Sequence, residues 1–312
     1  MAAAVVISLY ENTRTARQSL PEEGSPLADL VHPARALWWL FEPVHAVTYF
    51  TPEGLGAFED VGLRGVARSY FAGRAAPLGP VDAPPVIAAF FNFAPAPIER
   101  ALPAIWKLAD PDTALAARAA GASAALARLL EHVDRAQIEL ATDLLEDAVT
   151  RLDCAGRVLA AANAALPRPS DLHGRLWQAA TVMREHRGDG HIAALVSAGL
   201  DGCEALVVRC ALDVRREALQ PFRGWTDEEW DAAAARLTER GWLTERGTIT
   251  ECGRMRHQSL EAATDLAAAR VWEDHPRAEL DRLAAALKPI SALCRTALPP
   301  INPIGLPATT TA

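Results

Sequence analysis

The sequence predicts a mostly α-helical protein, and three observations carry this prediction. Alanine and leucine recur at helical spacing over residues 112–133 and 134–166, which is typical of long amphipathic helices. Prolines and Gly/Pro loops separate these and other helical segments. Only residues 243–250 have the pattern of a β-hairpin. Because 50% of the 312 residues are hydrophobic and 22% are charged, the chain can form a substantial core.

Residues 1–85 are predicted to form an arm followed by short helices. Residues 1–30 are mixed and polar, and we expect much of this arm to be mobile. Residues 31–60 predict a helix followed by a second helix after Pro52, and Pro43 is expected to break or kink the first one. Residues 62–85 predict a helical turn and then a Gly/Pro loop.

The stretch PRPSD at residues 167–171 is the clearest boundary in the sequence. Ser170 or Asp171 can cap a helix that runs to about His186, and RGDG at 187–190 predicts a turn. The further helices that the sequence predicts lie at residues 191–211, 226–241, 251–270 and 276–288.

Residues 223–254, RGWTDEEWDAAAARLTERGWLTERGTITECGR, have the pattern of a winged helix-turn-helix. Thr226 is a good N-cap, Glu229 completes a capping box, and Gly241 is a C-cap signal. A strand, a wing and a second strand then fit residues 243–250. The parts that we expect are a mobile arm (1–30), a diverged helical domain (31–167), a winged-helix domain (168–290) and a Pro-rich tail (291–312).

The helix that would enter a DNA groove is acidic. Residues 226–240 hold five acidic side chains and two arginines, and the whole chain has a net charge of −8. Specific binding requires several phosphate neutralisations, so this composition argues against a general affinity for nucleic acid or an anionic membrane. The wing is more basic, which leaves weak or conditional DNA contact open. The candidate DNA-binding residues are Arg236, Arg240, Arg246, Arg254 and Arg256.

Two parts of the sequence echo each other. HAVTYFTPEGLGAFE begins at His45 and HIAALVSAGLDGCE begins at His191, and in each the histidine is followed by Gly-Leu and then Glu. ELATDLLEDAV (139–149) also resembles LEAATDLAAARV (260–271). A duplicated module would make the chain a pseudo-dimer, with a homodimer as the other arrangement, and a pocket would fit between the copies. Chance similarity between Ala/Leu-rich helices is the alternative.

Three segments, ARALWWLFEPVHAVTYFTPE, YFAGRAAPLGPV and RGWTDEEWDAAAARLTERGWL, together resemble the SalK-like actinobacterial proteins. The resemblance covers most of residues 33–290. These proteins carry a helix-turn-helix label and are compared with MarR-type regulators, which implies a winged-helix fold. Some members resemble products of specialised-metabolite clusters, so the resemblance implies either a regulator or a pathway enzyme. It carries over no catalytic residues.

Candidate ligand-binding residues lie in the first half of the chain. His45 and Tyr49 share a helix face at i, i+4 spacing, and His45 can serve as a ligand contact or a general base. A buried histidine bonded to a neighbour is the alternative. Arg74 lies in AGRAAPLGP, a loop that can hold its guanidinium toward an acidic ligand, although it can equally be a surface arginine.

The stretch AFFNFAP at residues 89–95 groups aromatic rings around an amide. Phe91 and Phe93 can line a pocket with Asn92 as its fixed polar group, and core packing is the alternative. No metal-binding or phosphate-loop motif is present, so we expect no metal and no cofactor. Five cysteines without a C-x-x-C pair, and a start without a basic n-region, predict a cytoplasmic protein away from membranes.

Three functions fit these patterns. The leading hypothesis is a cytoplasmic ligand-binding protein of the transcriptional-regulator type, with a small, partly aromatic metabolite between the halves and weak or conditional DNA contact by the wing. The alternative is a cofactor-independent enzyme of specialised metabolism that uses the candidate histidine, tyrosine, arginine and asparagine. The third is a protein-interaction module, which predicts an exposed apolar patch near Trp225, Trp230 and Trp242.

Overall fold

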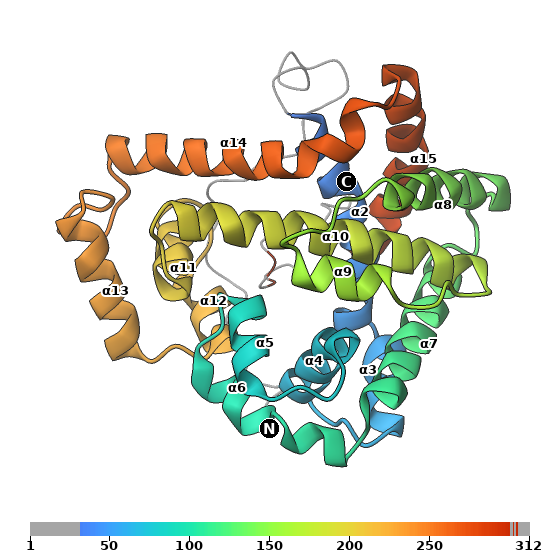
Figure 1. Ribbon diagram of the computed structural model, residues 1–312, viewed down its shortest axis with the longest axis horizontal. Helices are drawn as coiled ribbons and strands as arrows, with labels where there is room; N and C mark the ends of the chain where they lie inside the picture. The colour runs from blue at the N-terminus through green and yellow to red at the C-terminus, as the bar shows by residue number, and fades with distance from the viewer. Residues whose placement is uncertain (1–31, 300–301, 303, 305–312) are drawn as a thin grey trace.

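The computed structural model describes residues 32–299 together with Asn302 and Ile304, and these residues fold almost entirely into helices (Figure 1). The predicted mostly α fold is confirmed. The β pairing in this part of the chain is a single bridge between Leu243 and Ile249, so the predicted wing is a tight loop with one paired position. The predicted arm at residues 1–30 lies outside the described residues.

The longest helix, α10 (Leu172–Ser197), runs through the middle of the molecule (Figure 1). The largest core lies between α10 and five other helices, and Trp177 on α10 is 1% exposed within it. These helices are α2 (Pro33–Phe50), α7 (Pro111–Leu129), α8 (Arg135–Thr150), α14 (Glu251–Glu273) and α15 (Arg277–Thr296). This core takes side chains from both sides of residue 167, and the division into domains stays a prediction.

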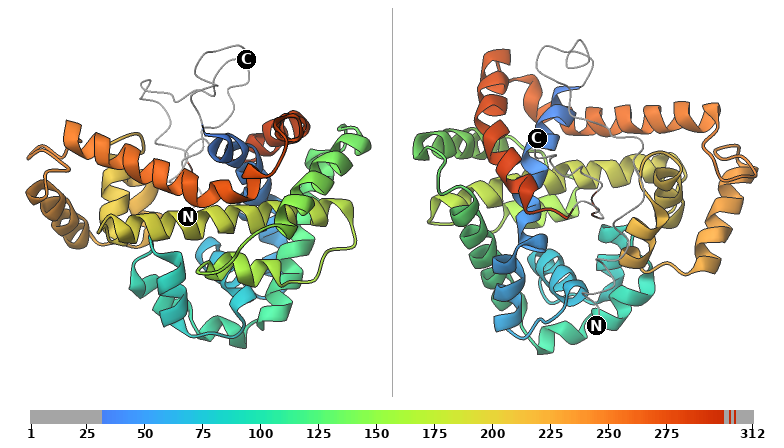
Figure 2. Two further views of the ribbon diagram at one scale, coloured as in Figure 1. Left: turned by 45° about the horizontal axis from the view of Figure 1, so that its top comes forward. Right: turned by 180° about the vertical axis from the view of Figure 1, so that it is seen from behind.

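Two smaller cores complete the fold. The second core lies among α3 (Pro52–Asp60), α4 (Val66–Ala75), α5 (Ala83–Phe90), α6 (Pro95–Ala101), α7 and α9 (Val158–Ala164), with 3-10 turns at Ala76–Leu78 and Ala104–Lys107. The third core lies at the opposite end of α10 from α8, among α11 (Gly202–Cys210), α12 (Arg216–Arg223) and α13 (Asp227–Glu239) (Figure 2).

Helix α2 continues through Pro43, where the sequence predicted a break or kink. Pro43 has no backbone N–H to donate to the carbonyl of Trp39 one turn earlier. That carbonyl instead accepts a hydrogen bond of 2.7 Å from Nη2 of Arg295 on α15. A contact between residues far apart in the sequence therefore compensates for the missing helical bond.

Helix α10 also continues through RGDG, so the predicted turn at residues 187–190 is wrong. Nη2 of Arg187 donates to Asp265 on α14 at 3.2 Å. Oδ2 of Asp189 accepts from the backbone N–H groups of Leu159 and Ala160, at 3.0 and 2.9 Å, at the start of α9. These contacts with α9 and α14 outweigh the low helix propensity of glycine, about 1 kcal/mol per residue.

Several predicted boundaries also shift. The predicted helices at 134–166 and 191–211 are each divided into two, and α15 extends to Thr296, beyond the predicted end at 288. Within residues 62–85, where the sequence predicted one helical turn, the structure has the 10-residue helix α4. Within the described residues, no single helix has both the length and the apolar composition to cross a bilayer; α10 and α11 meet that test only together, bent by 96°.

The start of α13 confirms the predicted capping box. Oγ1 of Thr226 accepts from the N–H of Glu229 at 3.2 Å, and Oε2 of Glu229 accepts from the N–H of Thr226 at 2.9 Å. Gly241 has a φ of 71°, which suits glycine just after the helix end. These signals are local in the sequence, which explains why they predicted the element correctly.

Candidate functional site

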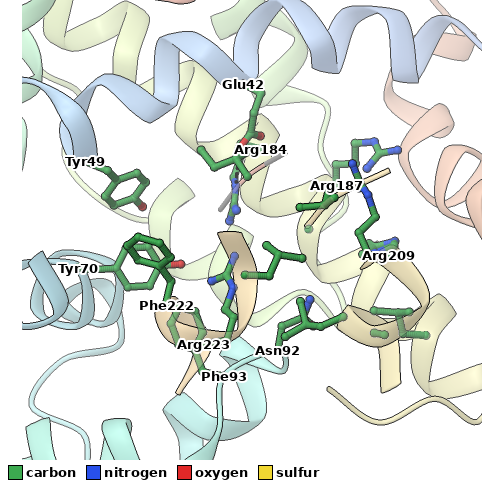
Figure 3. Close-up of a pocket in the computed structure, with 18 of the residues that line it drawn as sticks. Glu42, Tyr49, Tyr70, Asn92, Phe93, Arg184, Arg187, Arg209, Phe222 and Arg223 are labelled. Atoms are coloured by element: carbon green, nitrogen blue, oxygen red, sulfur yellow. Dashed lines mark hydrogen bonds and ion pairs between the residues drawn. The ribbon is translucent and has the colours of Figure 1, made fainter. Parts of the chain in front are cut away.

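A cavity of about 700 Å³ lies between the N-terminal helices and helices α11 and α12 (Figure 3). Its walls come from α2, α4, α6 and the loop before α6, from α10, α11 and α12, and from α14 and α15. This volume is within the range of roughly 300 to 1,000 Å³ that is typical of small-molecule sites. A molecule bound there would touch α11, α12 and the N-terminal helices together.

The cavity wall is positively charged. Its arginines are Arg35, Arg100, Arg184, Arg187, Arg209, Arg223 and Arg295. Its carboxylates are those of Glu42, Asp213 and Glu261. Among the described residues, the wall has seven arginines against three carboxylates, whereas the full sequence has a net charge of −8.

Glu185 lies on α10 directly behind the cavity wall and anchors two arginines. Its side chain is 1% exposed, and it accepts hydrogen bonds of 3.0 Å from Nε and Nη2 of Arg74 and from Nη1 of Arg184. Burial alone would raise the pKa of this carboxyl, but the two guanidiniums hold its pKa well below the ordinary range. Glu185 is therefore ionised at neutral pH and fixes both arginines.

Arg184 reaches from α10 into the cavity (Figure 3). Its Nε donates to Oε1 of Glu42 at 3.3 Å, and Nε1 of Trp38 donates to the other oxygen of Glu42 at 2.7 Å. The described residues provide no acceptor for Nη2 of Arg184. This nitrogen can therefore donate to a bound molecule.

Tyr70 on α4 lies between aromatic rings and guanidiniums. Its ring centroid is 5.0 Å from that of Tyr49 and 5.3 Å from that of Phe93, and its hydroxyl accepts from Nη1 of Arg74 at 3.1 Å. Burial raises the pKa of Tyr70, but Arg74 and Arg223 outweigh it and bring the pKa below the usual value of 10. Burial and the neighbouring Tyr70 instead raise the pKa of Tyr49.

His45 lies one layer behind the wall and is 1% exposed. Its Nδ1 is 3.0 Å from Oγ1 of Thr181, and its ring stacks on Trp177 and meets the edge of Tyr49. Among the described residues its Nε2 has no hydrogen-bond partner. Burial lowers the pKa of His45 well below 6.5, and Arg184 lowers it further, so the ring is neutral at pH 7.

The predicted ligand-binding residues divide between the wall and the layer behind it. Tyr49, Asn92 and Phe93 line the cavity, whereas His45 and Arg74 do not. Arg74 is neither in a loop nor exposed, because its pairing with a buried carboxylate extends helix α4 through it. Ligand contact by these residues stays a prediction.

Phe91 is the sixth predicted ligand-binding residue, and it packs against the third core rather than lining the cavity. It has a φ of 41°, and its carbonyl oxygen is 2.0 Å from where a Cβ at Gly202 would lie. Glycine at the start of α11 therefore allows this helix to pack directly on the 91–92 backbone.

The sequence analysis named Arg74 but missed the other polar residues around the cavity. Tyr70 is spaced i, i+4 from Arg74 in YFAGR, which is a usable signal for a shared helix face. Arg184 and Glu185 lie in a stretch that the sequence assigned to a helix end, where charged side chains are expected in water. Arg223 lies at the end of α12, a helix that the sequence did not predict.

At the other end of the cavity, the charges are paired within the protein. Asp265 accepts from Nε of Arg35 at 3.1 Å and from Nη2 of Arg187 at 3.2 Å. Nδ1 of His191 is 2.9 Å from Oγ1 of Thr264, and burial lowers the pKa of His191 to about 4. The other histidine of the suggested repeat also contacts a threonine hydroxyl, but the repeat itself stays a prediction.

The two candidate DNA-binding arginines on α13 are bonded to α11. Nε of Arg236 donates to Oε1 of Glu204 at 2.9 Å, and Nη1 of Arg240 donates to Oε2 of the same carboxylate at 3.0 Å. Arg236 also pairs with Asp201. The exposed acidic residues of α13 are Asp227, Glu228, Glu229, Asp231 and Glu239. Arg216 on α12 pairs with Asp227 and Asp231, and the other exposed carboxylates of α13 oppose phosphate contact.

The region of the wing presents basic side chains to solvent. Arg246 and Arg254 are exposed, and neither forms an ion pair with another described residue. Arg256 donates to the carbonyl of Arg240 at 2.8 Å and lies over the ring of Trp242. The guanidiniums of Arg246 and Arg254 therefore form no ion pair with the described residues.

The predicted exposed tryptophan patch is not present. Trp230 is 4% and Trp242 is 3% exposed, because both pack in the third core. Nε1 of Trp225 donates to the carbonyl of Asn92 at 2.9 Å, which joins the helix-turn-helix end to the loop before α6. These rings stabilise the fold and offer no apolar docking surface.

The structure has α11, α12 and α13 followed by the loop at 243–250, whereas the sequence predicted a helix at 191–211, a helix at 226–241 and a wing at 243–250, without α12. A family model described as a helix-turn-helix family matches residues 34–299. No curated protein and no solved structure matches the chain. Because the matched segment covers most of the 312 residues, this protein belongs to that helix-turn-helix family.

Proposed function

We propose that this protein binds a small molecule in the cavity between its helix-turn-helix helices and its N-terminal helices, as a regulator-type protein whose wing contacts DNA weakly. The observation that carries this proposal is the cavity wall, where the described residues supply seven arginines and three carboxylates in a chain of net charge −8. A local excess of positive charge attracts an acidic ligand even though the protein as a whole is negative. Membership of a helix-turn-helix family supports the regulator type.

Weak DNA contact follows from where the basic side chains lie. Arg236 and Arg240 are engaged by carboxylates of α11, and the rest of the exposed face of α13 is acidic. Arg246 and Arg254 are the exposed guanidiniums near the wing. A helix that reads base edges needs phosphate contacts beside it, so α13 is poorly suited to enter a groove.

We expect a weak affinity for a random-sequence duplex that depends only modestly on salt. Two phosphate contacts predict a slope of about −2 for log K against log salt, roughly a tenfold loss between about 50 and 200 mM. Fluorescence anisotropy measures this slope. The double variant Arg246→Ala/Arg254→Ala should lose binding, whereas Arg236→Ala should change the affinity by less than about twofold, because Arg236 is already paired.

A slope near −6, or loss of binding in Arg236→Ala, would indicate that α13 contacts the phosphates and would contradict this interpretation. Absence of binding at about 50 mM salt would contradict DNA contact altogether, but it would leave the ligand cavity untouched.

A second candidate, a cofactor-independent enzyme, is supported by one observation. The hydroxyl of Tyr70 lies at the cavity wall, where Arg74 and Arg223 lower its pKa. A phenolate in this position can accept a proton from a bound substrate. His45, the candidate base from the sequence, is neutral but lies behind Tyr49 and Trp177.

Titration of tyrosine absorbance tests this second candidate. The chain has three tyrosines, so one early ionisation is a large part of the signal. We expect one tyrosine to ionise below pH 10 in the unmodified protein, because Arg74 and Arg223 stabilise the Tyr70 phenolate. This ionisation should persist in Tyr49→Phe and disappear in Tyr70→Phe. Coincident curves for Tyr70→Phe and the unmodified protein would remove the support for an activated phenol.

A further inference from the structure

The cavity has a buried centre where several hydrogen-bond donors converge. Figure 3 shows Arg184, from α10, and Arg223, from α12, pointing toward the space between them. The hydroxyl of Tyr70 is beside this space and interacts with Arg74 and Arg223. Nη2 of Arg184 has no acceptor in the described part of the chain. Donors aimed at one point from separate helices are typical of an anion site.

Three guanidiniums and three carboxylates lie around this centre, those of Arg74, Arg118, Arg184, Glu42, Glu185 and Asp189. Arg118 donates to two neutral acceptors, the carbonyl of Gly73 and Oδ1 of Asn163, at 2.9 and 3.1 Å. Nη2 of Arg184 faces the cavity, and the described residues give it no acceptor. A hydrogen bond from a guanidinium to an anion is stronger than one to a neutral group, so the centre favours a negatively charged ligand.

The guanidiniums at the other end of the cavity are paired with carboxylates of the protein. At the other end, Arg35 and Arg187 share the carboxylate of Asp265, and Arg209 pairs with Asp213. A bound anion therefore gains most between Arg184 and Arg223. A carboxylate fits this site, because its two oxygens match the guanidinium fork of arginine, and the oxygens of a phosphate match it in the same way.

Aromatic rings form the wall next to the anion site. Tyr49, Tyr70 and Phe93 lie in a row with neighbouring centroids 5.0 and 5.3 Å apart, and all three line the cavity. The guanidinium of Arg223 is 4.4 Å from the centroid of Phe93, so the charge and the rings adjoin directly. A flat apolar ring can pack against this wall while its substituent reaches the guanidiniums.

We propose that the ligand is an aromatic monocarboxylate, whose carboxylate lies between Arg184 and Arg223 and whose ring packs against Tyr49, Tyr70 and Phe93. This inference rests on the proposed small-molecule function and specifies the chemistry of its ligand. Arg74 and Glu185 act as positioning residues, because they hold Tyr70 and Arg184 without lining the cavity.

Isothermal titration of the full-length protein with two probes tests the anion site. The probes are 2-naphthoate and its neutral analogue 2-naphthalenemethanol, which share one ring system. We expect 2-naphthoate to bind at least about tenfold more tightly at pH 7, since charge-assisted hydrogen bonds are stronger than neutral ones. Equal binding, or tighter binding of the alcohol, would overturn the anion site while leaving the cavity as a ligand site. Binding of neither probe would contradict the proposed small-molecule function as well.

Two matched variants locate the carboxylate. Arg223→Gln should weaken 2-naphthoate binding by about tenfold and leave the alcohol within about twofold, because only the acid uses the guanidinium. Arg100→Gln is the control, since Arg100 lines the cavity but is exposed on α6. An equal loss for both probes in Arg223→Gln, or a larger loss in Arg100→Gln, would overturn the placement. The probe comparison on the unmodified protein decides the proposal even if Arg223→Gln fails to fold.

Discussion

Replacing Glu185 with glutamine is expected to lower the free energy of unfolding by about 3–5 kcal/mol, because it leaves buried guanidiniums without their carboxylate. Glu185 is 1% exposed and accepts hydrogen bonds from both Arg74 and Arg184. A glutamine amide has only one acceptor oxygen, so it cannot bond both arginines as the carboxylate does. Urea denaturation monitored by circular dichroism measures the change.

A double-mutant cycle separates the ion pair from general disruption. Arg74→Met combined with Glu185→Gln should lose less than the sum of the two single losses, because each removes the buried charge that the other leaves unpaired. Glu139→Gln is the matched control, since Glu139 pairs with Arg135 on the exposed face of α8. It should change stability by no more than about 1 kcal/mol. Additive losses, or a small effect of Glu185→Gln, would mean that the buried charges are not coupled.

Acidification from pH 7 to pH 5 is expected to destabilise the protein by about 2 kcal/mol or more, and His186 is the clearest source. Burial, with Arg157, lowers the pKa of His186 to about 4, compared with about 6.5 in an unfolded chain. Between these values the unfolded state binds more protons, so stability falls as the pH falls. The ring of His186 is neutral in the folded protein at pH 7. Between pH 7 and pH 5 it contributes about 2 kcal/mol to the loss of stability.

Other groups modify this acid response. The pKa of His191 is lowered to about 4 and that of His45 well below 6.5, and both add to the loss. Burial raises the pKa of Asp189 to about 6, so the folded state takes up this proton first and regains about 1 kcal/mol at pH 5. Urea denaturation at pH 7, 6 and 5 measures the sum. In His186→Gln, the loss of stability between pH 7 and pH 5 should be smaller by about 2 kcal/mol. In His132→Gln, which changes an exposed histidine, the loss should equal that of the unmodified protein. Equal acid losses in these two variants would contradict the assignment.

Local signals predicted local structure well in this chain. The capping box at Thr226 and Glu229 and the glycine at residue 241 each act within one helical turn, and α13 forms where they predicted it. The i, i+4 spacing of His45 and Tyr49 likewise predicted that they share a face of α2. Tyr49 lines the cavity, and the ring of His45 contacts that of Tyr49. Periodicity and capping depend on neighbouring residues alone, so a single sequence contains them.

The features that the sequence predicted wrongly depend on contacts between residues that are far apart in the sequence. RGDG reads as a turn, but Asp189 caps α9 and Arg187 bonds to α14, which keeps the helix intact. The break expected at Pro43 is absent because Arg295 satisfies the carbonyl that proline cannot. The position of Arg184 also depends on such contacts, since its guanidinium bonds to Glu42 on α2 and to Glu185. Such pairings cannot be read from a single sequence.

A ligand in the cavity should contact the helix-turn-helix through α12, and amide hydrogen exchange measures this contact directly. With saturating 2-naphthoate, we expect slower exchange in α12 near Arg223 and in the loop at Asn92 and Phe93, with no change in α8, which does not line the cavity. That pattern would establish that the helix-turn-helix forms one wall of an occupied ligand site. Unchanged exchange in α12, or protection confined to α8, would contradict it.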